Sequence, residues 1–127
     1  MKFFFTAFFA VLSLFACSHN TWRDMSANEF YNYSQNHEVQ VVDVRTTKEY
    51  LQGHIVAAIN LDIQQKNFIQ QAEKKLNKSN PVAVYCRSGH RSAIAAQRLS
   101  EKGFKVANLK SGFLGWKSAG KPITSGF

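Results

Sequence analysis

The order of apolar segments along the chain is the feature that most constrains its fold. Short runs rich in β-branched residues alternate with segments in which apolar residues recur at helical spacing. Such alternation predicts an α/β fold in three layers, with a central parallel sheet of about five strands and helices on both faces. The expected strands cover 39–44, 57–61, 82–86 and 104–109. Residues 18–24 are expected to lead into a further strand at the edge of the sheet.

Local signals place helices between these strands. Ser26 and Glu29 have the spacing of a capping box, so a helix is expected to start at Ser26. Thr47 and Asp62 are expected to cap the next two helices. The remaining helices are expected over 92–101 and within 111–120.

The first sixteen residues have the pattern of a signal peptide. Lys2 precedes an apolar run over 3–16, which is too short to span a bilayer comfortably. Residues 1–16 are therefore expected to be removed from the mature chain. The alternative is that they stay attached as an uncleaved membrane anchor.

The end of this run, "LFAC", is similar to the lipobox of bacterial lipoproteins, in which the cysteine becomes the lipidated first residue. Cys17 is the expected lipidation site, 17–24 a lipidated N-terminus and tether, and 25–127 the folded domain. The domain would then lie at the periplasmic face of a bacterial membrane, held there by its lipid. A secretory signal cut near Ala16, which leaves a soluble periplasmic protein, is the alternative.

The net charge of +8 allows nucleic acid, an anionic membrane or small anions as partners. Export argues against nucleic acid. Much of the excess is scattered over predicted helix faces, a pattern typical of solvated surface. The isolated His19 and His37 lack the spacing of metal ligands, and no metal or organic cofactor is expected.

Cys86 is the residue with the clearest chemical potential. If Cys17 is lipidated, Cys86 has no partner for a disulfide within the chain, and an unpaired thiol in an exported protein indicates reactivity. A buried, inert cysteine is the alternative. Cys86 ends a predicted strand, and ligands of open α/β sheets bind beyond the carboxyl ends of the strands.

The segment after Cys86 favours a thiolate. Backbone amides of the loop and of the following helical turn can converge on one point at the positive end of the helix dipole. Arg87 and Arg91 add two permanent cations, and Gly89 permits a turn with positive φ. Such surroundings lower the pKa of a thiol. Cys86 is therefore predicted to be a nucleophile near neutral pH, with a sulfur anion or a phosphate ester as substrate.

Two other loop residues allow two interpretations each. Ser88 either donates its hydroxyl to the bound anion or is a small turn residue. His90 either supplies a proton or charge, or is a loop residue that faces solvent.

Three separated stretches carry a family resemblance: "VVDVRTTKEYLQGHIVAAINL", "VYCRSGHRSAIAAQRL" and "VANLKSGFLGW". In this order they resemble the motifs of the single-domain rhodaneses, the thiosulfate sulfurtransferase family. The resemblance covers about residues 22–127 and implies a rhodanese-like fold. Ser111-Gly112 stands where the family more usually has Gly-Gly.

The resemblance implies a sulfurtransferase in which Cys86 takes a sulfane sulfur from a small anionic donor and passes it, as a persulfide, to cyanide, a thiol or a protein. It also implies that the loop 87–91 cradles the donor and the persulfide. Arg91 is the favoured anion ligand and Arg87 the second choice. The alternatives are a persulfide carrier that serves a partner protein and a phosphatase. The six-residue loop favours sulfur chemistry, because the phosphatase relatives have a loop one residue longer.

Three further residues of the motifs are expected to support the loop. Asp43 and Arg45 follow a buried strand and are expected to form a structural ion pair near it. Glu49 is expected to accept hydrogen bonds from the loop or from Arg91.

Overall fold

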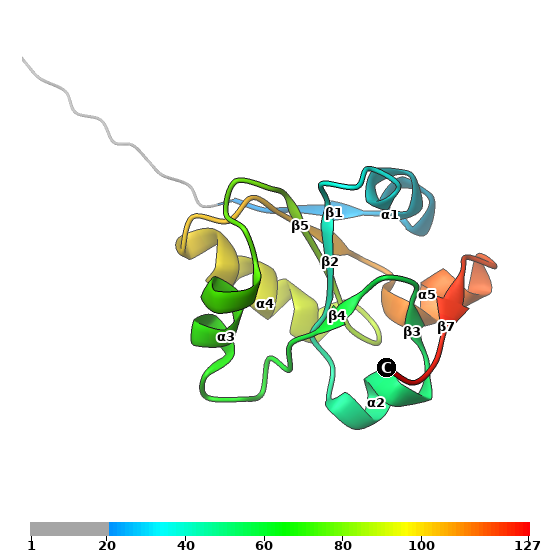
Figure 1. Ribbon diagram of the computed structural model, residues 1–127. Helices are drawn as coiled ribbons and strands as arrows, with labels where there is room; N and C mark the ends of the chain where they lie inside the picture. The colour runs from blue at the N-terminus through cyan, green and yellow to red at the C-terminus, as the bar shows by residue number, and fades with distance from the viewer. Residues whose placement is uncertain (1–20) are drawn as a thin grey trace, which may run out of the picture.

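The computed structural model describes residues 21–127, which form a five-stranded parallel sheet with helices on both faces (Figure 1). The strands are β1 (Arg23–Met25), β2 (Gln40–Asp43), β4 (Ile59–Asn60), β5 (Val82–Tyr85) and β6 (Val106–Leu109). Their order across the sheet is β1-β6-β5-β2-β4. The predicted α/β fold with a central parallel sheet is confirmed, and β5 lies at its centre.

Each face of the sheet has its own apolar core, because side chains alternate between the faces along a strand. The helices are α1 (Ala27–Ser34), α2 (Thr47–Gln52), α3 (Phe68–Lys75), α4 (His90–Glu101) and α5 (Gly112–Ser118). Val84 packs with buried residues of α3 and α4, whereas Ala83 packs with those of α1, α2 and α5. Figure 1 shows α3 and α4 together on one side of the sheet and α1 and α5 on the other.

A second, two-stranded sheet pairs β3 (His54–Ile55) with β7 (Ile123–Thr124) in antiparallel register. The sequence does not predict it, because two-residue strands leave almost no pattern. The pairing brings the C-terminal segment beside the end of α2, where the Gly126 amide donates to the Leu51 carbonyl at 3.0 Å.

The start of α1 agrees with the sequence, whereas the starts of α2, α3 and α4 differ from it. Ser26 caps α1 in a complete capping box with Glu29, as predicted. Thr46, and not Thr47, caps α2, because only Thr46 lies three residues before Glu49 and so completes the reciprocal bonds of a second box.

The helix expected after Asp62 begins later than predicted. α3 starts at Phe68, and the Asp62 carboxylate instead accepts a hydrogen bond from the Gln64 amide at 2.8 Å. Two successive turns follow, in which Gln65 N–H donates to the Asp62 carbonyl and Phe68 N–H to the Gln65 carbonyl. The short polar side chain of Asp62 stabilises this turn rather than a helix start.

The N-terminal predictions concern mostly residues that the structure does not describe. The expected signal peptide 1–16 and the lipidation site Cys17 lie outside the described residues. The sheet begins at Arg23, within the segment 17–24 expected to be a tether, and Trp22 already packs against the apolar core. Between residues 21 and 127, no helix is long and apolar enough to cross a membrane.

Candidate active site

The loop between β5 and α4 places Cys86 directly after the central strand, with only 1% of its surface exposed. α4 begins at His90, two residues before the predicted start at Ser92, with Gly89 as N-cap at φ +96°. Ser92 therefore lies in the first turn of α4, above the end of β5. This arrangement directs amides of the first helical turn, which lack partners within the helix, toward the sulfur.

The sulfur of Cys86 accepts three hydrogen bonds from this turn. The amides of Gly89 and Ser92 donate at 3.2 and 3.3 Å, and the Ser92 hydroxyl donates at 3.3 Å. Burial raises the pKa of Cys86 and is the largest single influence on it. The hydrogen bonds from Ser92 and from the loop amides act in the opposite direction and prevail, so the pKa lies below its ordinary value. The site therefore favours a thiolate.

Ser92 is the site residue that the sequence analysis missed. After burial, the hydrogen bonds from its hydroxyl and its amide are the largest influences on the pKa of Cys86, and both lower it, whereas the sequence argument relied on the two arginines of the loop. The sequence contains a signal for this role, because a small hydroxyl residue stands six positions after the cysteine, near the start of the predicted helix. Whether its hydroxyl and amide reach the sulfur depends on the residue at which that helix begins.

The N-terminus of α5 fixes the backbone of the cysteine loop. The Phe113 amide donates to the Cys86 carbonyl at 2.8 Å, and the Leu114 amide to the Arg87 carbonyl at 3.1 Å. Gly112 has φ +65°, and a Cβ at this position would collide with the Arg87 carbonyl. Glycine is required here because the two segments approach so closely.

The loop residues 87–91 differ in their exposure to solvent. Arg87, Ser88 and His90 are exposed, whereas Gly89 and Arg91 are partly buried. His90 therefore faces solvent, which was one of its two interpretations. Cys86 is a free cysteine. Within the described part of the chain, no group of three or more His, Cys, Asp or Glu residues could hold a metal ion.

Arg91 is held by Glu49 and joins α4 to α2. Its two terminal nitrogens donate to the two carboxylate oxygens at 2.8 and 3.0 Å, a bidentate pair. The hydrogen bond from Arg91 is the main reason that the pKa of Glu49 falls from about 4.5 to about 2, with help from Thr46. Glu49 therefore accepts from Arg91, one of the two arrangements expected for it.

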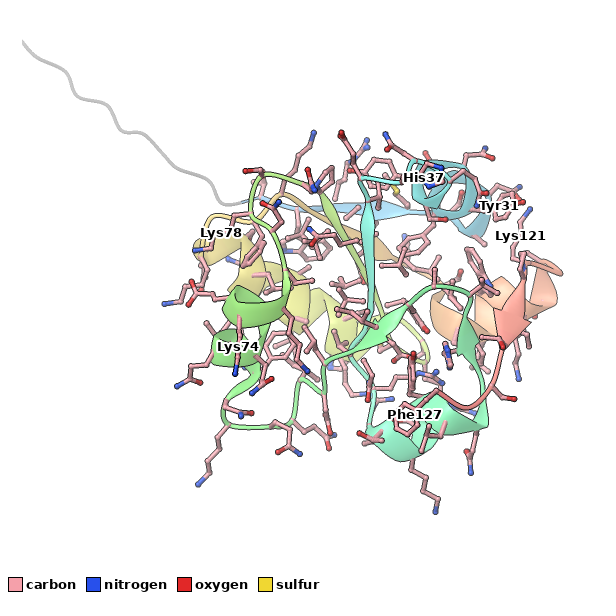
Figure 2. All side chains as sticks on the ribbon, in the orientation of Figure 1. Tyr31, His37, Lys74, Lys78, Lys121 and Phe127 are labelled. Atoms are coloured by element: carbon pink, nitrogen blue, oxygen red, sulfur yellow. The ribbon has the colours of Figure 1, made fainter. Side chains whose placement is uncertain are left out.

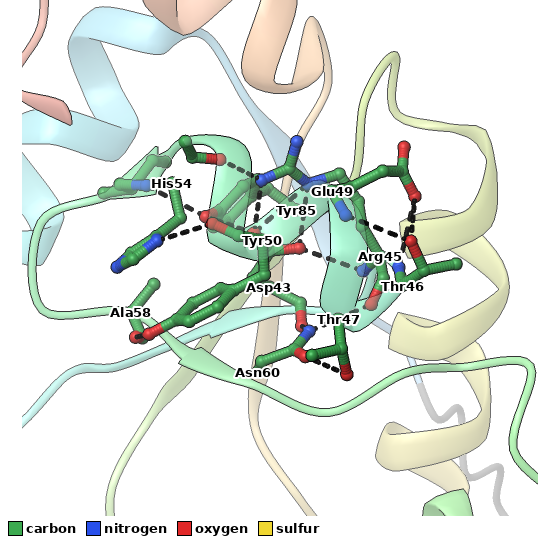
Figure 3. A network of polar contacts seen from close by, with 12 residues as sticks. Asp43, Arg45, Thr46, Thr47, Glu49, Tyr50, His54, Ala58, Asn60 and Tyr85 are labelled. Carbon is green, nitrogen blue, oxygen red and sulfur yellow. Dashed lines mark hydrogen bonds and ion pairs between the residues drawn. The ribbon is translucent and has the colours of Figure 1, made fainter. Parts of the chain in front are cut away.

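Asp43 lies fully buried beneath the loop at the centre of a polar network (Figure 3). It accepts from Arg45 Nε at 3.0 Å and Nη2 at 2.6 Å, which confirms the predicted ion pair. The Tyr85 hydroxyl donates to it at 2.7 Å, and Arg45 also donates to the Gly53 carbonyl at 2.6 Å. Because Tyr85 directly precedes Cys86, this network fixes the strand end from which the thiol projects.

The chain is similar to proteins of one family. A family model described as "Rhodanese-like domain" matches residues 26–119. Thiosulfate sulfurtransferase GlpE of Coxiella burnetii is 34% identical over 98 residues, covering 76% of this chain and 89% of that protein. GlpE of Shewanella oneidensis is 34% identical over 102 residues, covering 79% and 97%.

A solved structure shows the same fold. The crystal structure of a rhodanese-related protein from Thermoplasma volcanium matches with a TM-score of 0.71 at 29% sequence identity. The match covers 81% of this chain and 98% of that one. The relation therefore extends over the whole fold and not only over the cysteine loop.

Replacing Ser92 tests the cause of the lowered thiol pKa. In Ser92→Ala the sulfur loses the hydroxyl donor, so the pKa of Cys86 is expected to rise and the alkylation rate by iodoacetamide to reach its midpoint at a higher pH. The pH profile of alkylation measures this. Ser100→Ala is the control, since its hydroxyl lies on the same helix but donates to the Gln97 carbonyl. An unchanged profile in Ser92→Ala would contradict the assignment.

Replacing Glu49 tests the bond between α2 and α4. Because folding lowers the pKa of Glu49 to about 2, its contribution to stability is complete above about pH 4.5 and is lost as the pH falls toward 2. Glu49→Gln is expected to lower the free energy of unfolding by about 1–3 kcal/mol at neutral pH, allowing for partial solvent screening, and by less near pH 3. Urea unfolding at both pH values measures this.

The control for this experiment is Glu73→Gln, which breaks the exposed pair between Glu73 and Lys78. Exposed ion pairs contribute little, so this variant is expected to stay close to the wild type. Equal stability of Glu49→Gln and Glu73→Gln at neutral pH would show that the pair with Arg91 does not support the fold.

Proposed function

Because the chain belongs to the rhodanese-like domain family, we propose that it is a sulfurtransferase that moves a sulfane sulfur from thiosulfate, or a similar small anionic donor, to cyanide, a thiol or a protein acceptor. The observation that supports this most directly is the Cys86 sulfur, buried at a helix N-terminus and held by three donors. A thiolate in this position is a nucleophile with a built-in site for negative charge beside it.

The reaction needs no oxidant or reductant from outside. The Cys86 thiolate attacks the outer sulfur of thiosulfate, a new S–S bond forms, and the S–S bond of thiosulfate breaks with its electron pair leaving on sulfite. The enzyme then carries a persulfide anion. An acceptor such as cyanide attacks the terminal sulfur, thiocyanate leaves, and the thiolate is restored.

The loop amides stabilise both states of the cysteine. Gly89 and Ser92 donate to the thiolate, and the persulfide carries the same single negative charge on a sulfur one bond further out, at the same N-terminus of α4. Because a covalent intermediate separates donor and acceptor steps, the kinetics are expected to be ping-pong.

Intact mass spectrometry tests the proposal. Incubation of the domain with thiosulfate is expected to add about 32 Da, one sulfur atom, to the wild type and nothing to Cys86→Ser. Addition of cyanide should then release thiocyanate and return the original mass. Failure of the wild type to gain mass would contradict the proposal. A persulfide that forms but does not react with cyanide or small thiols would instead favour a carrier for a partner protein.

We also propose, from residues 1–17 alone, that the domain is exported and anchored through a lipid on Cys17. In a bacterial host the full chain is expected to fractionate with membranes and Cys17→Ala with the soluble periplasmic fraction. Cys86→Ala is the matched control and should stay with the membranes. Soluble wild-type protein in the periplasm would contradict the anchor.

A further inference from the structure

A cleft of about 210 Å³ lies beside the cysteine loop, between α2 and α5. Glu49 and Gln52 line it from α2 and Leu114 and Lys117 from α5, and Arg45 and Arg87 are also among its lining residues. The volume is below the range of pockets that take drug-sized ligands, so the cleft suits a small molecule. Lys117 is the lining residue that no motif singled out.

The charges that line the cleft do not balance. Arg45 is neutralised by the buried Asp43, and Glu49 by Arg91. Arg87 and Lys117 make no ion pair with any residue of the described part of the chain. The cleft therefore has an excess of two positive charges, and a concave site lined by one sign of charge concentrates its field on a bound ion of the opposite sign.

The position of Lys117 is fixed relative to the nucleophile. α5 is joined to the cysteine loop by the hydrogen bonds of the Phe113 and Leu114 amides. Lys117 lies one turn further along, on the same helix face as these two residues, and its ammonium group lies 5.3 Å from the centre of the Phe113 ring. The contacts that hold the loop thus also fix the backbone of Lys117, whose exposed side chain lines the cleft.

Arg91, the anion ligand that the family resemblance favours, is poorly placed for that role. Both of its terminal nitrogens already donate to Glu49. An anion that took them would have to break a bidentate pair and leave the Glu49 carboxylate without its main partner, which costs free energy. The exposed Arg87 and Lys117 carry no such penalty.

We propose that this cleft binds the anionic group of the sulfur donor, with Lys117 and Arg87 as its cationic ligands and Arg91 as a positioning residue. This rests on the proposed function. A small dianion such as thiosulfate matches the two excess charges. Thiosulfate and the sulfite that leaves both carry two negative charges, so the two cations bind the donor and the leaving group about equally and contribute mainly to donor binding.

Steady-state kinetics with thiosulfate and cyanide test the role of Lys117. Lys117→Gln is expected to raise the KM for thiosulfate roughly 3- to 10-fold with kcat within about twofold, because the lost charge contributes mainly to donor binding. Lys117→Arg should restore the KM to within about twofold. Lys74→Gln is the control, because Lys74 projects from α3, away from α2 and α5 (Figure 2). Equal KM values for Lys117→Gln and Lys74→Gln would overturn the inference.

Binding measured without turnover separates this inference from the proposed function. Calorimetry with thiosulfate compares the Cys86→Ser protein with the double variant Cys86→Ser, Lys117→Gln. The double variant is expected to bind thiosulfate roughly 3- to 10-fold more weakly. If wild type forms no persulfide but this difference in binding is seen, the proposed function fails and the anion site stands. If persulfide forms and binding is unaffected by Lys117→Gln, the transfer activity stands and the anion site is wrong.

Discussion

The sulfur of Cys86 is almost fully buried and accepts three hydrogen bonds, and much of the structure follows from the need to place their donors. The donors are backbone amides of the β5–α4 loop and the hydroxyl of Ser92. When amides of a tight loop face inward, carbonyls of the same loop face outward and need partners of their own. α5 supplies these partners through its first amides, and Gly112 permits the close contact because it has no side chain. The cysteine loop and the first turn of α5 are thus held together by direct hydrogen bonds.

The second constraint is the buried ion pair between Asp43 and Arg45. Removing one partner of such a pair destabilises a protein strongly, whereas the intact pair adds little net stability. Its main effect is therefore to fix the positions of the groups around it. Asp43 holds Arg45 and the Tyr85 hydroxyl, which in turn accepts from the Ile55 amide, so β2, β5 and β3 are tied together beneath the cysteine. Burial and the nearby Asp43 raise the pKa of Tyr85, which therefore stays a neutral donor.

The sequence predicted what depends on local pattern. Apolar, β-branched runs identified the central strands, and Ser26 with Glu29 identified a helix start, because these signals act within a few residues. Thr47 was assigned wrongly because the neighbouring Thr46 has the correct spacing to Glu49, and Asp62 because its carboxylate stabilises a turn instead of a helix start. The β3–β7 sheet could not be predicted, because its stability comes from contacts between distant segments.

The difference between local patterns and contacts of distant segments also explains which features of the candidate site could be predicted. Cys86 and its loop are contiguous, so the sequence could predict their place between a strand and a helix. Asp43 and Arg45 are separated by one residue, and their ion pair was predicted correctly. The roles of the cations depend on which of them already has a partner. In the sequence Arg87 and Arg91 are equivalent charges at the two ends of a loop. In the fold Glu49, from a different helix, takes both nitrogens of Arg91.

Pairing with Glu49 changes what Arg91 can do for the reaction. A neutral ion pair contributes little field at the cleft but holds the first turn of α4, and with it the donors to Cys86, against α2. The field that attracts an anionic donor must then come from cations without a carboxylate partner, and in the described chain the cleft has two such cations, Arg87 and Lys117. In the proposed reaction, positioning the thiolate and binding the donor therefore fall to different basic residues, and a donor would enter and sulfite would leave without breaking the bonds that hold Cys86 in place.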